Sequence, residues 1–196
     1  MIIVSATDGV QHPASTPVSN VNVANGLTVL RIVLVPVFLA ALFVDGGHTT
    51  LWRWIAFAVF AVAMITDRID GQIARRYGLI TDFGKLMDPI ADKALTGAAF
   101  VGLSVLGELP WWVTLVILAR EFGITAFRFA VIRDGVIPAS RGGKLKTLLQ
   151  TIAIGLYLMP LPGWMDVPSQ VAMGAALFVT VATGVDYLIS WWRGRA

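Results

Sequence analysis

Four aspartates within residues 67–92 carry the clearest chemical signal in the sequence: Asp67, Asp70, Asp88 and Asp92. The first two lie three positions apart and the last two lie four positions apart. Each pair therefore shares one face if its segment is helical. If the two helices are antiparallel neighbours, the four carboxylates converge, and they repel one another unless cations neutralise them.

This set of side chains predicts a site for hard divalent cations. Carboxylate oxygens suit Mg²⁺ or Mn²⁺, and the chain has no cysteine and only two histidines to offer as other ligands. Two such ions would suit a displacement at phosphorus, one at the entering oxygen and one at the leaving phosphate. Gly71 and Ala74 leave one helix face open to a bulky ligand, and Arg75 can pair with a phosphate.

The remainder of the chain predicts the helices that must position these side chains. Of its 196 residues, 57% are hydrophobic and only 14% are charged, whereas soluble domains carry about 25% charged residues. A helix that crosses a bilayer needs about 20 mostly apolar residues. We therefore predict an all-α polytopic membrane protein with six transmembrane helices, centred on the apolar runs Leu27–Val44, Leu51–Thr66, Ala94–Gly107, Pro110–Ile132, Leu145–Met159 and Val167–Trp192.

The second and third apolar runs are short, and polar helical ends that carry the aspartates would complete them. Polar side chains at this depth need a wet cavity or one another, so we predict a polar cavity that faces the cytoplasm between these two helices. Most of the 15 Lys and Arg residues fall on the inner side if the N-terminus is cytoplasmic. The positive-inside rule therefore places both termini in the cytoplasm. We expect the protein to lie in the cell membrane.

A short tail precedes the membrane domain. Residues 1–20 are rich in Ser, Thr, Pro, Asp and Gln, a composition that predicts a disordered N-terminal tail. A signal peptide is not expected, because no basic segment precedes the first apolar run. Residues 21–196 are expected to form a single six-helix domain.

The aspartate segment resembles the signature of the CDP-alcohol phosphotransferase family, D-x2-D-G-x2-A-R-x8-G-x3-D-x3-D. Residues 67–92 match this signature at every fixed position. Members are six-helix membrane enzymes, commonly homodimers, that transfer a phosphatidyl or similar group from a CDP-linked donor to an alcohol and release CMP. The resemblance implies that the four aspartates hold two divalent ions and that Asp92 is also the general base. It further implies that Gly71, Arg75 and Thr81 contact the CDP part of the donor.

The flanking residues resemble the branch of the family that uses CDP-diacylglycerol as donor and sn-glycerol 3-phosphate as acceptor. Residues 22–31 are similar to the pattern N-x-P-N-x-L-T-x-x-R, with Ala24 in place of Pro, and residues 81–93 are similar to T-D-F-G-K-x-x-D-P-x-A-D-K. Asn25 and Thr28, at the start of the first helix, are placed to help hold the nucleotide. The products implied are phosphatidylglycerol phosphate and CMP, and the implied partners are the two substrates, the bilayer and a second copy of the chain.

The acceptor carries a phosphate and therefore requires cations. Arg120 lies within an apolar run, and an intramembrane charge is a functional candidate; Lys144 and Lys146 lie at the cytoplasmic start of the fifth helix. We expect these three residues to bind the acceptor. Two structural alternatives stay open, namely an ion pair between Arg120 and Glu121 and a purely topological role for Lys144.

Three other functions are weighed against this one. A cardiolipin synthase of the same family would use phosphatidylglycerol as acceptor. A membrane prenyltransferase also binds Mg²⁺-diphosphate, but its two acidic motifs normally lie much farther apart than Asp70 and Asp88. A cation transporter would also hold intramembrane carboxylates, although transporters usually show repeats with broken helices, and this sequence shows none. No nucleic-acid partner is expected.

Overall fold

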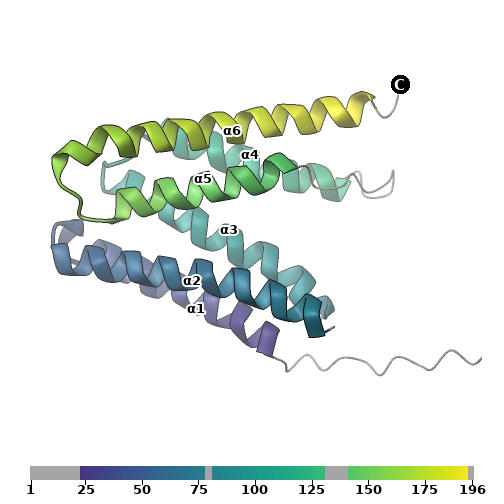
Figure 1. Ribbon diagram of the computed structural model, residues 1–196, viewed down its shortest axis with the longest axis horizontal. Helices are drawn as coiled ribbons and strands as arrows, with labels where there is room; N and C mark the ends of the chain where they lie inside the picture. Colours follow the sequence, from purple (N-terminus) through teal and green to yellow (C-terminus); the bar gives the residue numbers. More distant parts are fainter. Residues whose placement is uncertain (1–22, 78–80, 131–140, 194–196) are drawn as a thin grey trace, which may run out of the picture.

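The computed structural model describes residues 23–77, 81–130 and 141–193. Side chains are described throughout these ranges except at residues 24, 70, 71, 73–75, 77, 82–86, 128–130, 141 and 142. Within the ranges the chain forms helices and no strand (Figure 1). The helices are α1 (Val23–Phe43), η1 (Val44–Gly47), α2 (Thr50–Tyr77), α3 (Asp82–Val105), α4 (Trp111–Ala130), α5 (Arg141–Leu158), η3 (Gly163–Met165) and α6 (Asp166–Arg193).

The six long helices confirm the predicted all-α class. The predicted polar extensions are also present, because α2 continues past its apolar run to Tyr77 and α3 begins at Asp82. Among the described residues, three stretches are long and apolar enough to cross a membrane: Asn25–Gly47, Thr50–Ile69 and Gly163–Arg193. The predicted tail, residues 1–20, lies outside the described residues.

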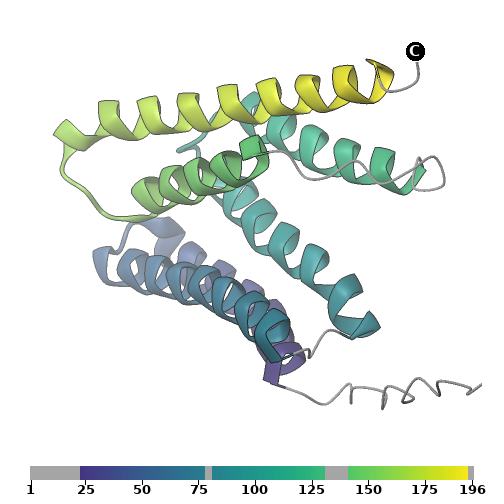
Figure 2. The same cartoon turned by 45° about the vertical axis from the view of Figure 1, so that its right-hand side comes forward.

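Two groups of helices lie on either side of α3. Helix α1 packs along both α2 and α3, and α6 packs along both α4 and α5. In Figures 1 and 2, α3 runs obliquely from the α1–α2 pair towards α4 and α6. The core between the helices is apolar and aromatic, with Phe38, Phe60, Phe100, Leu103 and Ile154 all buried.

Large apolar side chains also cover the outside of the helices. Val33, Val62, Leu115 and Phe178 are all exposed. A soluble monomer rarely exposes so much apolar surface, whereas lipid tails are as apolar as these side chains. The outer surface therefore suits a membrane, which agrees with the hydropathy of the sequence.

The two ends of the bundle differ in what they contain. One end holds η1 and the α3–α4 and α5–α6 connections, and the other holds the start of α1, the end of α2, the start of α3 and the end of α6 (Figure 1). At the first end, Arg53 is buried and pairs with Glu108 at 2.8 Å. There Gly47, with φ +78°, approaches Leu106 so closely that a Cβ would lie 2.9 Å from its side chain. A pocket lined by Arg53, Glu108 and Tyr157 also lies at this end, and the aspartate segments lie at the other end.

Candidate active site

One face of α1 carries three buried polar side chains, Asn25, Thr28 and Arg31, spaced three residues apart. Residues at this spacing lie on the same side of a helix. Buried polar groups in apolar surroundings need hydrogen-bond partners. The α2–α3 segment supplies those partners, so this face of α1 is directed at the residues of the aspartate signature.

Each of the three side chains meets a residue of that segment. Asn25 donates from Nδ2 to Thr81 Oγ1 at 2.8 Å. Thr28 donates from Oγ1 to Asp88 Oδ1 at 2.6 Å. Arg31, which has no exposed surface, places Nη1 2.6 Å from Asp67 Oδ1. Helix α1 therefore orients two of the predicted metal ligands.

The described carboxylates of the signature form what we call the acidic centre: Asp67 of α2 with Asp88 and Asp92 of α3. Asp67 is close enough to Asp88 and to Asp92 for their negative charges to act on one another. The side chain of Asp67 is 37% exposed, so the centre is open to solvent on that side. Arg31 offsets only part of this charge, and the excess is negative.

The donor atoms of the acidic centre fit a hard divalent cation. All are carboxylate oxygens, the ligands that Mg²⁺ and Mn²⁺ prefer. Among the residues with described side chains, no three His, Cys, Asp or Glu form a ready-made metal cluster. The fourth predicted ligand, Asp70, lies on α2 one turn beyond Asp67, and its side chain is outside the described set.

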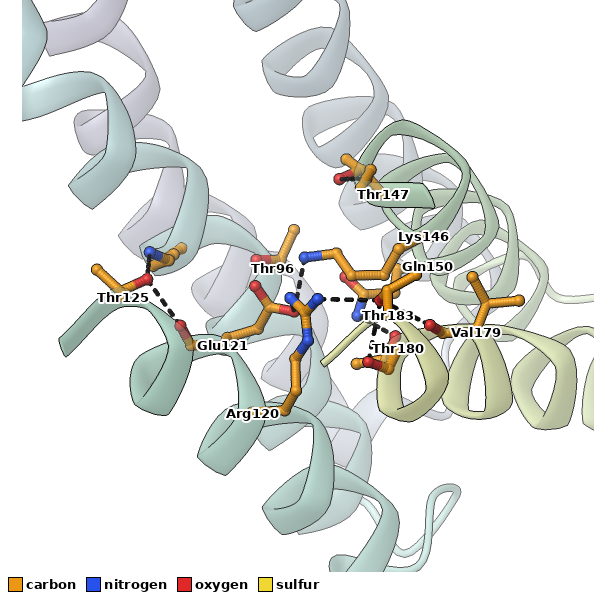
Figure 3. A network of polar contacts seen from close by, with 12 residues as sticks. Thr96, Arg120, Glu121, Thr125, Lys146, Thr147, Gln150, Val179, Thr180 and Thr183 are labelled. Atoms are coloured by element: carbon orange, nitrogen blue, oxygen red, sulfur yellow. Dashed lines mark hydrogen bonds and ion pairs between the residues drawn. The ribbon is translucent and has the colours of Figure 1, made fainter. Parts of the chain in front are cut away.

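A second polar cluster joins α4, α5 and α6, and we call it the basic network: Arg120, Glu121, Lys146 and Thr183 (Figure 3). Glu121 Oε1 accepts from Lys146 Nζ at 2.6 Å and lies 3.3 Å from Arg120 Nη1. Arg120 Nη2 donates to Thr183 Oγ1 at 2.9 Å. Two cations share one carboxylate, so the network keeps an excess of positive charge.

The acidic centre and the basic network are connected through α3 and α4. Lys146 and Glu121 are both close enough for their charges to act on Asp92. Lys93, the residue after Asp92, donates to Thr125 Oγ1, and Thr125 donates in turn to the Glu121 carbonyl at 2.8 Å. These contacts join the segment of Asp92 to α4, the helix that carries Arg120 and Glu121.

The structure separates some of the predicted residues. Lys144 is exposed, whereas Lys146 is buried, because residues two apart on a helix do not share a face. Lys146 belongs to the basic network, and Lys144 lies on a different side of α5. Gly71 and Arg75 lie on α2, as predicted, but their side chains are outside the described set.

Sequence reasoning missed several residues of the site. It identifies Arg31 only as an inner-side cation and as part of the flanking pattern, although the three-residue spacing from Thr28 is a usable signal. Thr183 and the Lys93–Thr125 contact have no such signal, because each pairs residues from different helices. The predicted alternative for Arg120, an ion pair with Glu121, is present.

Comparison with known proteins gives a consistent result. Residues 21–183 match the family model described as CDP-alcohol phosphatidyltransferase. The chain is 60% identical over 167 residues to a probable phosphatidylglycerophosphate synthase of Mycobacterium tuberculosis, and the match covers 85% of this chain and 80% of that protein.

Two more distant relatives carry the name CDP-diacylglycerol–glycerol-3-phosphate 3-phosphatidyltransferase. The protein from Rickettsia felis is 36% identical over 171 residues, which cover 85% of this chain and 93% of that protein. The protein from Bacillus subtilis is 35% identical over 185 residues, which cover 88% of this chain and 96% of that protein. In each case the match includes most of both chains.

Proposed function

Because the chain belongs to the CDP-alcohol phosphatidyltransferase family of integral membrane enzymes, we propose that it transfers the phosphatidyl group of CDP-diacylglycerol to sn-glycerol 3-phosphate. The products are phosphatidylglycerol phosphate and CMP. The names of the relatives support this reaction. The observation that carries it is the contact of Lys93, the residue after Asp92, with Thr125 of α4, because this contact joins the acidic centre to the helix of Arg120 and Glu121. The acceptor has to present a hydroxyl and a phosphate to the same site.

Enzymes of this family generally depend on divalent metals, and the acidic centre has the donors to hold them. We assign Asp67, Asp70, Asp88 and Asp92 as ligands of two Mg²⁺ or Mn²⁺ ions. When bound, the ions would supply positive charge that stabilises the departing CMP and makes a nearby hydroxyl more acidic. Thr28 and Arg31 hold Asp88 and Asp67 in place, as partners behind metal ligands commonly do.

The donor is a lipid and reaches the site from the bilayer. Its acyl chains remain among the lipids that cover the apolar outer surface, and its nucleotide enters the polar space beside the start of α1. Asn25 and Thr81 are paired there and buried, and together with Thr28 they form one side of the nucleotide position. Gly71 and Arg75 of α2 complete the donor contacts in this proposal.

The chemical step is a direct displacement at phosphorus. Asp92 accepts the proton of the acceptor 1-hydroxyl while the oxygen attacks the β-phosphorus, which carries the diacylglycerol. The new P–O bond forms, the bond from the β-phosphorus to the bridging oxygen breaks, and the electron pair leaves with CMP. A carboxylate is a weak base for an alcohol, so electrostatic stabilisation contributes more than proton transfer does.

The basic network binds the acceptor phosphate. Arg120 and Lys146 share the Oε1 atom of Glu121, and a phosphate dianion offers them more negative charge and more acceptor oxygens. In sn-glycerol 3-phosphate, three carbons separate the 1-hydroxyl from the phosphate. Cations that bind the phosphate while Asp92 contacts the hydroxyl must therefore lie near Asp92, and the charge of Lys146 acts on Asp92. Lys144 is exposed at the start of α5. In this proposal it contacts the acceptor phosphate at the cytoplasmic entrance of the site.

The chain is a multi-pass membrane protein. The side of the membrane on which its substrates are available indicates its orientation. We propose that the acidic centre faces the cytoplasm, where sn-glycerol 3-phosphate and divalent ions are available, with both termini on the same side and the protein in the cell membrane. The family resemblance extends this proposal to a homodimer.

Release of CMP by the purified, full-length protein in detergent tests the proposed function. The assay contains CDP-diacylglycerol and Mg²⁺, with sn-glycerol 3-phosphate, with phosphatidylglycerol, or with neither. We expect release only with sn-glycerol 3-phosphate, loss of release with a chelator, and recovery when Mg²⁺ is restored. Release with phosphatidylglycerol alone would identify a cardiolipin synthase instead. Cation flux in vesicles without CMP release would indicate a transporter and overturn the assignment.

A further inference from the structure

Helix α6 passes Arg120 at a residue that has no side chain. Gly184 is buried, and a Cβ placed on it would lie 3.0 Å from Cγ and 3.2 Å from Nε of Arg120. Comfortable contacts between carbon atoms are about 3.5–4.0 Å. The stem of Arg120 therefore occupies the space that any other residue at position 184 would need.

Arg120 has little freedom to move out of the way. Its Nη1 lies 3.3 Å from Glu121 Oε1, and its Nη2 donates to Thr183 Oγ1 at 2.9 Å. Thr183 precedes Gly184 on α6, and its hydroxyl is itself held by the Val179 carbonyl at 2.7 Å. A shift of the Arg120 stem away from α6 would pull the guanidinium off Thr183.

The glycine is not explained by helix geometry or by general close packing of α6. Alanine is a better helix former than glycine, so a glycine inside a helix needs a reason. A Cβ placed on Gly174, more than two turns earlier on the same helix, would meet open space within 4 Å. The tight contact at Gly184 is specific to the place where Arg120 crosses the helix.

We propose that Gly184 is a positioning residue for acceptor recognition. It leaves room for the Arg120 guanidinium to lie between Glu121 and Thr183, the orientation from which Arg120 binds the phosphate of a phosphorylated alcohol. The proposal rests on the proposed function, in which Arg120 contacts sn-glycerol 3-phosphate. Gly184 acts only through Arg120 and touches no substrate.

Steady-state kinetics of the full-length protein in detergent micelles test this role. We expect Gly184→Ala to raise KM for sn-glycerol 3-phosphate about tenfold, because small displacements of a binding group cost large factors in binding. The kcat and the KM for CDP-diacylglycerol should stay within about twofold of the parent values, since the acidic centre is not touched. Gly174→Ala is the matched control and should leave all three constants unchanged.

A double-substitution cycle separates positioning from other effects. Arg120→Ala alone should raise the same KM, and Gly184→Ala should add nothing in the Arg120→Ala background, because coupled residues are not additive. Thr183→Val removes a restraint on Arg120 without adding volume and should change the same KM in the same direction. This variant carries the test if Gly184→Ala fails to give a monodisperse protein.

The outcomes distinguish this inference from the proposed function. If Arg120→Ala raises the KM but Gly184→Ala and Thr183→Val do not, the positioning role is wrong and the acceptor site stands. If the Gly184 and Arg120 effects add, Gly184 acts by another route and the inference is overturned. If Arg120→Ala leaves the KM unchanged, Arg120 does not bind the acceptor. Both the positioning role of Gly184 and the acceptor role of Arg120 are then overturned.

Discussion

The acidic centre and the basic network are both built where three helices meet, but they carry opposite charge. In the acidic centre, α1 contributes Arg31 against three carboxylates of α2 and α3. In the basic network, two cations of α4 and α5 share Glu121. The first arrangement attracts cations and the second attracts anions. A site that brings them together suits a reaction between a metal-bound diphosphate and a phosphorylated alcohol.

The two clusters also differ in how they are held. The acidic centre depends on residues at helical spacing, three on α1 and the pair Asp88 and Asp92 on α3, so these helices contribute regular rows. The basic network depends on single residues from three helices and on the missing side chain at Gly184. The difference predicts that the acidic centre determines whether the enzyme turns over, and that the basic network determines which acceptor it uses.

The largest effect is expected from Asp92→Asn, which tests the catalytic side of the comparison. The amide cannot accept the proton and is a poorer metal ligand, so kcat should fall at least about 10³-fold, within the range of general-base loss combined with loss of a metal ligand. Asp186→Asn, at an exposed position of α6, is the matched control. If Asp92→Asn retained more than a tenth of the activity, Asp92 would be neither the general base nor a required metal ligand.

An intermediate effect is expected when the basic network loses a cation. Lys146→Ala should raise KM for sn-glycerol 3-phosphate about 100-fold, the upper range for a charge-assisted hydrogen bond, and leave KM for CDP-diacylglycerol nearly unchanged. Lys144→Ala, two residues away and exposed, should have less than about a threefold effect, because exposed charges contribute little. Equal effects of the two substitutions would show that burial on α5 does not decide acceptor binding.

The smallest effect is expected from Arg31→Lys, which keeps the charge beside Asp67 but shortens the side chain. Partners behind metal ligands typically change metal affinity by about 10- to 100-fold when altered, and the retained charge places this change near the lower limit. The Mg²⁺ concentration for half-maximal activity should rise about tenfold. Arg68→Lys, at an exposed position of the same helix as Asp67, should not change it. A kcat loss without a change in Mg²⁺ dependence would contradict a role in holding Asp67.

The helices themselves were largely predictable. Apolar run length located all six, and the polar ends of the second and third were predicted because neither apolar run is long enough to span. Pairing across helices was not predictable in the same way. Lys93 meets Thr125 and Arg120 meets Thr183, and both contacts depend on how α3 and α6 are placed against α4.

The sequence by itself determined the class of protein, the ligand chemistry of the aspartates and the family, because helical spacing and apolar length are local properties of the chain. Only the tertiary structure decided that Arg31 serves Asp67, that Lys146 rather than Lys144 joins Glu121, and that Gly184 lies under Arg120. Each of these depends on which faces of different helices meet. That choice is made by the packing of the whole bundle, since many helix pairs offer similar apolar faces.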